Sequence, residues 1–266
     1  SRVTRVTIVE ERLPLGLDLG SQYARIEALG YVLVGLVDED GQRGVGWTFS
    51  IDPGEASRIA TVLRERAALV VGLDPADPDG SWDRLRPSLT GLERGLGSPA
   101  ASAVDVALWD LRGRQTNTPV HRLLGARTDR LQTYASDALW SSLPPDVLAR
   151  NAAAFVAEGF GAIKIRTGGS KDPAQEAARV RAVREATGDA TLVLYDALQG
   201  YDVESAIALG RALEGEGVGW LEDPVPESDL AGLARVRAAL DLPIASGEDA
   251  TWRSSVWSIV APSPIV

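Results

Sequence analysis

The chain has 266 residues, a formal net charge of −10 at pH 7 and an apolar fraction of 45%. This length suffices for one large domain or two unequal ones, and the composition is ordinary for a globular protein. The acidic charge argues against nucleic acid or an anionic membrane as the main partner. No apolar run approaches the ~18 residues that span a membrane, and we expect no signal peptide before the first strand-like segment. The absence of cysteine excludes disulfides and zinc–sulfur sites, and we expect a cytoplasmic location.

The first 50 residues are predicted to form antiparallel β-structure. Residues 2–9 alternate in polarity, and the turn Asp38-Glu-Asp-Gly41 separates two further strand-like runs, 23–37 and 44–49. Between the first two runs, residues 13–22 carry glycine and proline without strong periodicity, which indicates a loop.

Helices are predicted to follow these strands, with a Pro/Asp/Gly loop at 74–80. The helical runs cover residues 53–71, 81–95 and 100–115. Strands followed by helices, without alternation, are typical of an α+β domain.

From about residue 130, strands and helices alternate. Strands are expected at 131–136, 162–166, 191–196, 218–222 and 242–246, and helices at 145–158, 172–187, 202–214 and 229–240. Asp172, Asp202 and Ser228 stand at helix N-cap positions. Alternation predicts a parallel sheet, open or closed. Only one more apolar run, 255–260, follows, so the chain falls short of the eight strands of a closed α/β barrel.

Polar residues end four of these strands at similar spacing. Lys164 and Arg166 close one strand, and Asp196, Glu222 and Glu248 follow Arg166 in steps of 30, 26 and 26 residues. A βα unit has about this length, so we expect these side chains at the same end of neighbouring parallel strands. Carboxylates from strands about 4.8 Å apart can converge on one hard cation, and oxygen ligands favour Mg²⁺ over zinc. Each acid alone is also explained as a helix cap or an arginine partner.

Lysine is rare in this chain. Of 27 basic residues, only Lys164 and Lys171 are lysine. Lysine can lose its proton when desolvated whereas arginine in effect cannot, so proton transfer is one explanation for position 164. A structural ion pair is the other.

Several motifs resemble the enolase superfamily, in its mandelate-racemase-like branch. They are Lys164-Ile-Arg166, Asp196, Trp-Leu-Glu-Asp-Pro224 and the Ser-Gly-Glu-Asp that contains Glu248. Residues 103–111 and 118–125 are similar to the capping-domain signature of that family. The resemblance extends over nearly the whole chain. It implies an α+β capping domain at 1–125 and, at 126–266, an α/β domain of the modified (β/α) barrel type that lacks its last strands.

The resemblance also implies an enzymatic reaction. Mg²⁺ bound by Asp196, Glu222 and Glu248 would hold a small carboxylate substrate while Lys164 and Arg166 face it. A base removes the proton next to the carboxylate, and the metal stabilises the enediolate. Loss of a hydroxyl then gives dehydration of an acid sugar, which we expect. Return of the proton on the other face would make the protein a racemase or epimerase instead.

Further implications of the resemblance concern the pocket and the assembly. The loop at 15–23 corresponds to the lid of the family, so Asp18, Gln22 and Tyr23 are expected to contact substrate, with Trp140 as a pocket wall. An ordinary surface loop and a packing role for Trp140 are the alternatives. Asp223 is expected to orient Glu222 or start the following helix. Family members also suggest a homo-oligomer.

Some positions depart from the family pattern. Arg166 replaces a second lysine, and because guanidinium is a poor base, we expect it to bind the substrate carboxylate or to hold Lys164 near neutral by charge repulsion. Leu198 replaces a frequent asparagine. The only histidine, His121, lies in the capping signature, so the His–Asp pair of the branch is missing. We expect the sequence to be incomplete rather than truncated in evolution, because an open barrel exposes an unpaired edge.

Two other functional classes remain open from the sequence. A non-catalytic relative could keep the metal site without a base, which Arg166 and the missing His–Asp pair favour. A barrel glycosidase could instead use two of the carboxylates, and its activity would survive metal removal.

Overall fold

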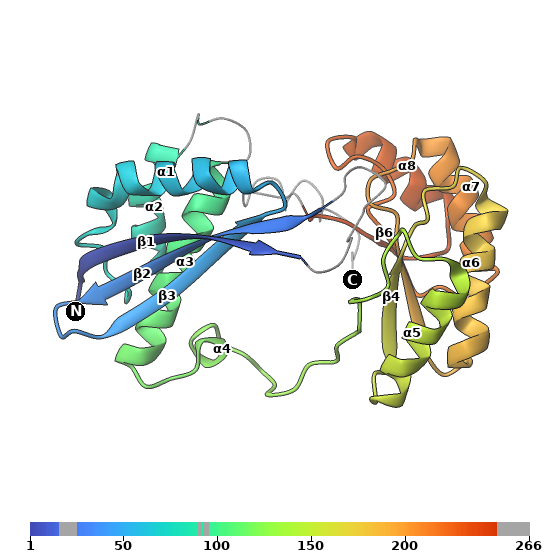
Figure 1. Ribbon diagram of the computed structural model, residues 1–266, viewed down its shortest axis with the longest axis horizontal. Coiled ribbons are helices and arrows are strands. Elements are labelled where there is room, and N and C mark those ends of the chain that lie inside the picture. The colour runs from blue at the N-terminus through green and yellow to red at the C-terminus, as the bar shows by residue number, and fades with distance from the viewer. Residues whose placement is uncertain (16–25, 90–91, 93–95, 249–266) are drawn as a thin grey trace. The chain divides into compact units, whose positions relative to one another are not determined.

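The computed structural model describes residues 1–15, 26–89, 92 and 96–248. Contacts between residues divide the chain into two compact units, with the boundary after Arg130 (Figure 1). No helix in the described part is long and apolar enough to cross a membrane. Each unit is described by itself below.

The N-terminal unit contains a three-stranded antiparallel sheet in the order β1-β2-β3. Its strands are β1 (Val3–Pro14), β2 (Ala28–Asp38) and β3 (Arg43–Ser50). The predicted β-structure is confirmed, but β1 continues through Leu13 and Pro14, where the sequence indicated a loop. Leu13 pairs with Leu29 and Pro14 with Ala28, so pairing with a distant segment overrides the local turn signal.

Helices α1 (Pro53–Val70) and α3 (Gly97–Gln115) cover one face of this sheet (Figure 1). Helix α2 (Pro78–Leu89) packs against α1 and α3, and the short α4 (Val120–Leu123) follows α3. Strands and helices that follow one another without alternation confirm the α+β prediction. Helix α2 begins inside the predicted loop, where the Asp77 side chain accepts a hydrogen bond from Gly80 N at 3.0 Å.

Strand β3 and helix α3 approach each other closely because both carry small residues. A Cβ added to Gly46 would lie 2.1 Å from Ala103 O, and one added to Gly44 would lie 2.4 Å from Ala107 O. The alanines of α3 are themselves fully buried. The small-residue pattern at 103–111 therefore sets how α3 packs on the sheet.

The C-terminal unit contains a parallel sheet in the order β4-β5-β6-β7, with helices between the strands. The strands are β4 (Ala162–Arg166), β5 (Leu192–Asp196), β6 (Leu221–Glu222) and β7 (Ile244–Ala245). The helices are α5 (Pro145–Ala157), α6 (Pro173–Thr187), α7 (Val203–Glu214) and α8 (Leu230–Ala239). The predicted alternation is confirmed.

Two local predictions in this unit are wrong. The strand expected at 131–136 is reduced to a single bridge between Ala135 and Ile163, because only Ala135 of residues 131–135 is buried. Helix α8 is capped by Asp229, which accepts from Gly232 N at 2.8 Å, and not by Ser228. Asp172 and Asp202 do cap α6 and α7.

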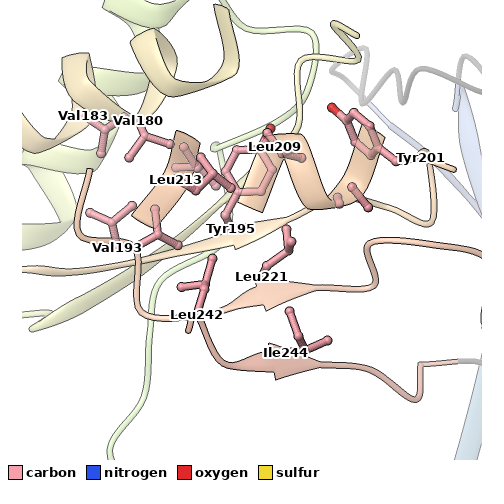
Figure 2. Packing of buried hydrophobic residues seen from close by; sticks show 14 of the residues in the cluster. Val180, Val183, Val193, Tyr195, Tyr201, Leu209, Leu213, Leu221, Leu242 and Ile244 are labelled. Atoms are coloured by element: carbon pink, nitrogen blue, oxygen red, sulfur yellow. The ribbon is translucent and has the colours of Figure 1, made fainter. Parts of the chain in front are cut away.

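The two faces of the parallel sheet have different chemistry. Alternate strand residues face the helices and form the core with them (Figure 2). The buried residues labelled there include Val180, Val183, Val193, Tyr195, Leu209, Leu213, Leu221 and Ile244. The intervening strand positions point to the opposite face, and these positions include Lys164, Arg166, Asp196 and Glu222. That face is where a site can form.

Candidate active site

The register of the parallel sheet brings the predicted site residues next to one another. Arg166 pairs with Asp196 across β4 and β5, and Asp196 pairs with Glu222 across β5 and β6. All three residues end their strands. The βα spacing in the sequence therefore does place these side chains at the same edge of the sheet.

Lys164 lies between the two carboxylates. Its Nζ donates a hydrogen bond to Glu222 Oε1 at 2.6 Å and lies 3.4 Å from Asp196 Oδ2. The lysine is 8% exposed and Asp196 only 3% exposed. Two carboxylates from adjacent strands thus converge on one positive charge, in a place where water screens little.

Burial and charge compete in setting the protonation of this cluster. Burial alone would lower the pKa of Lys164, but the hydrogen bond that Lys164 donates to Glu222 and the negative charges of Asp196 and Glu222 outweigh burial and raise the pKa. Burial raises the pKa of Asp196, although the Leu198 N–H and Lys164 partly oppose this shift. The interpretation in which Arg166 holds Lys164 near neutral therefore does not describe this arrangement.

Two aromatic side chains, Tyr134 and Trp220, lie beside this cluster and were not among the residues predicted from the sequence. Trp220 Nε1 donates to Glu222 Oε2 at 3.1 Å, and the Trp220 ring meets Tyr134 edge-on with centroids 5.7 Å apart. Lys164 Nζ lies 5.6 Å from the centre of the Tyr134 ring. One signal could have found Trp220: it stands two residues before Glu222, and positions i and i+2 share a strand face.

Arg166 is held by the segment that follows Ala135. Its guanidinium carbon lies 4.3 Å from the centre of the Trp140 ring, and Nη1 donates to Ser136 O at 3.0 Å. Stacking on an aromatic face and a directed N–H bond both restrict the plane of the guanidinium. Trp140 therefore packs on Arg166, a predicted site residue. A packing role for Trp140 and a role as a pocket wall do not exclude each other.

The backbone at this edge is strained. Leu198, Gln199 and Asp223 have φ values of 53°, 55° and 41°, in the left-handed region that side chains rarely adopt. Asp223 directly follows Glu222, and Leu198 and Gln199 stand two and three residues after Asp196. Strained backbone of this kind gathers at functional sites, where the surrounding structure holds it.

The donor atoms suit a hard cation, although the described residues do not complete a cage. Asp196 and Glu222 offer carboxylate oxygens that already converge on an ammonium group, and buried Asp223 has an Oδ1 with no hydrogen-bond partner in the described structure. Within 1–15, 26–89, 92 and 96–248, no three His, Cys, Asp or Glu side chains are gathered closely enough to hold an ion. Glu248, exposed in the turn after β7, thus does not join the other two there.

Burial, with the charges of Asp196 and Glu222, raises the pKa of Asp223. This carboxyl therefore loses its proton less readily than an exposed aspartate. Its expected role of orienting Glu222 stays a prediction. Asp18, Gln22 and Tyr23 lie outside the described residues, so their contact with substrate stays a prediction.

Comparison with known proteins identifies the family. Residues 3–125 match the N-terminal domain of the mandelate racemase / muconate lactonizing enzyme family, and residues 147–262 match the enolase C-terminal domain-like family. The chain belongs to the mandelate racemase / muconate lactonizing enzyme family. The resemblance seen in the sequence is confirmed.

Among curated relatives, L-talarate/galactarate dehydratase of Salmonella typhimurium is 34% identical over 82% of this chain and 54% of its own length. D-galactarolactone cycloisomerase of Agrobacterium fabrum is 32% identical over 98% of this chain and 68% of its own. The chain thus spans about half to two thirds of the length of these relatives. The crystal structure of L-talarate dehydratase from Polaromonas, complexed with Mg and L-glucarate, has a TM-score of 0.89. It is 30% identical, and the match covers 97% of this chain and 70% of that one.

Proposed function

We propose that the protein catalyses Mg²⁺-dependent removal of the proton next to a carboxylate, leading to dehydration of an acid sugar. The observation that carries this proposal is the position of Lys164 between Asp196 and Glu222 at the carboxyl ends of adjacent strands. A proton-transferring lysine beside carboxylates that suit a hard cation is the arrangement that such a reaction needs. The dehydratases among the relatives support acid sugars as the substrate class.

Asp196 and Glu222 would hold the Mg²⁺, since carboxylate oxygens are the ligands that this ion prefers. Glu248 would complete the set as the third ligand by moving towards these two carboxylates, with which it is not grouped in the described structure. When bound, the ion supplies positive charge that stabilises the negative charge developing on the substrate carboxylate. Asp223 would orient Glu222 from beside it.

The other site residues bind and shield the substrate. Lys164 faces the sheet edge and would accept the proton in its uncharged form. Mg²⁺ bound by Asp196 and Glu222 would favour that form, because it would neutralise the carboxylates that raise the pKa of Lys164. Arg166, with its plane set by Trp140 and Ser136, suits paired hydrogen bonds to a carboxylate or to neighbouring hydroxyls. Tyr134 would limit the access of water to Lys164. We propose Asp18, Gln22 and Tyr23 as the lid residues that select the substrate, and Trp140 as a pocket wall.

The test is incubation with a panel of aldarates and aldonates in D₂O with Mg²⁺, followed by NMR. A 2-keto-3-deoxy acid as product supports the proposal. Exchange of deuterium with inversion, and no such product, would replace dehydration by racemisation or epimerisation. Hydrolysis of aryl glycosides, assayed separately, that survives EDTA would point to a glycosidase. Metal binding without any turnover would point to a non-catalytic relative.

We further propose that the protein forms a homo-oligomer through the outer face of the N-terminal sheet. Trp47 and Phe49 are 50% and 48% exposed there, and both lie against Tyr31, with ring centroids 5.6 and 5.9 Å away. Val9 and Val45, also on this face, are exposed too. An apolar patch of this kind is typical of an interface.

Charge on the same face favours a second copy as the occupant. Arg5 and Arg43 flank Val37 at one end of the strands, and Glu11 lies beside Tyr31 towards the other end. A two-fold axis across the strands would place Arg5 of one copy opposite Glu11 of the other. The cytoplasmic location stays a prediction.

Light scattering after gel filtration tests the oligomer. Trp47→Glu should yield a smaller species, whereas Val106→Glu, at an exposed apolar position on α3, should leave the mass unchanged. A Trp47→Glu protein of unchanged mass would refute this interface.

A further inference from the structure

A fully buried carboxylate lies behind the site, on helix α6. Glu176 is 0% exposed. Its Oε1 accepts a hydrogen bond from Ser170 N at 2.8 Å, and its Oε2 accepts from Gly168 N at 2.9 Å and from the Tyr195 hydroxyl at 2.7 Å. One side chain therefore holds the loop that follows Arg166 and also the residue that precedes Asp196.

Arg179, one turn further along α6, extends these contacts to another loop. Its Nε lies 3.5 Å from Glu176 Oε2, and its Nη1 donates to Leu143 O at 2.8 Å. Arg179 is 9% exposed. Buried charges of this kind are normally paired, because removing an ion from water is unfavourable unless another charge or hydrogen bonds compensate.

The two loops that this pair joins directly follow Trp140 and Arg166, the two residues of the stack. The loop at 141–143 follows Trp140, on whose ring Arg166 stacks at 4.3 Å. The loop at 167–170 follows Arg166 itself, and it is further fixed by the bond of 2.6 Å between the Thr167 and Tyr201 hydroxyls. Glu176 and Arg179 thus contact both sides of the stack without touching it.

We propose that Glu176 and Arg179 form a positioning couple that sets the geometry of the Arg166–Trp140 stack. Its effect on the substrate rests on the proposed function, in which Arg166 binds a carboxylate or hydroxyl. The couple itself is defined by contacts within the C-terminal unit alone. Neither residue reaches the proposed metal ligands by a hydrogen bond recorded in the described structure.

A merely structural role for the couple makes a different prediction. Apolar residues of similar volume often replace buried ion pairs with little loss of stability. If the pair only filled the core, such a replacement would leave the stack unchanged. If the pair positions the stack, the loops and with them Trp140 should shift even in a stable variant.

Fluorine NMR with 5-fluorotryptophan measures this shift without any activity assay. The chain has seven tryptophans, and Trp140→Phe assigns the resonance of interest. Arg179→Lys should move the Trp140 resonance, because lysine cannot make both of the arginine contacts. Glu176→Gln should move it too, because the glutamine NH₂ group would face N–H and O–H donors where the glutamate has only acceptor oxygens. Arg181→Lys and Glu185→Gln, at exposed positions of the same helix, should leave it in place.

The outcome decides the proposal even if one variant fails to fold. Arg179→Met keeps the apolar stem and provides a second folded test, with circular dichroism as the check. An unmoved Trp140 resonance in the folded variants would overturn the positioning role. This result does not depend on turnover, so a failure of the proposed function leaves it interpretable.

With an active substrate in hand, a double-mutant cycle adds a second measurement. Arg179→Lys should lower kcat/KM about 10- to 100-fold, as expected for a misplaced binding group. In an Arg166→Ala background the same change should have little further effect on kcat/KM. The decreases in melting temperature caused by the two substitutions should instead be additive. Additive losses of activity in both backgrounds would show that the couple does not act through Arg166.

Discussion

Lys164 and Glu222 are 58 residues apart in the chain, and their Nζ and Oε1 atoms are 2.6 Å apart. The contact joins two strands that are not neighbours in the sheet, since β5 with Asp196 lies between them. It therefore exists only because three parallel strands end at the same level. Both the proposed chemistry and the simplest experiments start from this pair.

Lys164→Ala should lower turnover by orders of magnitude. Loss of a general base lowers kcat by about 10²- to 10⁴-fold, and Arg166 cannot replace it because guanidinium does not lose its proton. The measurement is steady-state kinetics on the best acid sugar of the panel. Lys171→Ala is the matched control, because this lysine is exposed and is expected to leave kcat within a few-fold. Unchanged turnover of Lys164→Ala would refute its role as the base.

Glu222→Gln should weaken Mg²⁺ binding by at least 10- to 100-fold, the range seen even for groups that only orient ligands. Calorimetric titration measures the affinity directly. Thermal unfolding gives a second readout, because an ion at 100 times its Kd stabilises the folded state by about 2.7 kcal/mol. Glu204→Gln is the control, because it removes an equal charge from an exposed ion pair. Its affinity for Mg²⁺ should equal that of the unaltered protein. Equal affinities in the two variants would exclude Glu222 as a ligand.

Asp38 should make the stability of the N-terminal unit pH-dependent. Burial alone would raise the pKa of Asp38, but hydrogen bonds from Gln115, Gln42 and Asp40 outweigh it and lower the pKa. A carboxylate with a depressed folded-state pKa stabilises the fold above its unfolded pKa, which is about 3.9. This stability is lost as the pH falls through the lower, folded-state value.

Denaturant unfolding between pH 7 and pH 2 measures this contribution. Asp38→Asn should lower the free energy of unfolding at pH 7 by about 1–3 kcal/mol, and the difference should shrink towards pH 2. Asp40→Asn, in the same turn but exposed, should change little. A difference for Asp38→Asn that stays constant across the pH range would contradict the titration.

Gly46→Ala should destabilise the N-terminal unit by about 1–3 kcal/mol or more, because the new Cβ would meet Ala103 O at 2.1 Å. Gly35→Ala is the control, since its Cβ would have no contact closer than 3.8 Å. Urea unfolding of the two variants compares them. If both variants unfold at the same midpoint, the close packing of β3 on α3 is not what requires glycine at position 46.

Much of the fold follows from local patterns. Residues 162–166 are predicted and observed as the same strand, and Asp172 and Asp202 cap the helices as expected, because such signals depend on neighbouring residues only. The prediction of a strand at 131–136 was wrong because strand formation depends on distant residues as well as on neighbouring ones. A strand needs a partner along its length, and only Ala135 has one in the described structure.

The sequence by itself determined the family, the α+β and α/β arrangement of its two parts, and the polar residues that end the parallel strands. Spacing along the chain carries that information, because each βα unit returns to the same edge of the sheet. Only the tertiary structure decided that Lys164 is paired with Glu222 and that Trp220 and Trp140 support the site. It also decided which charged residues of α6 are buried. Glu176 and Arg179 are buried and Glu185 and Arg181 are exposed, although nothing in the sequence distinguishes the two pairs. Burial depends on the loops that close over a helix, and those loops come from other parts of the chain.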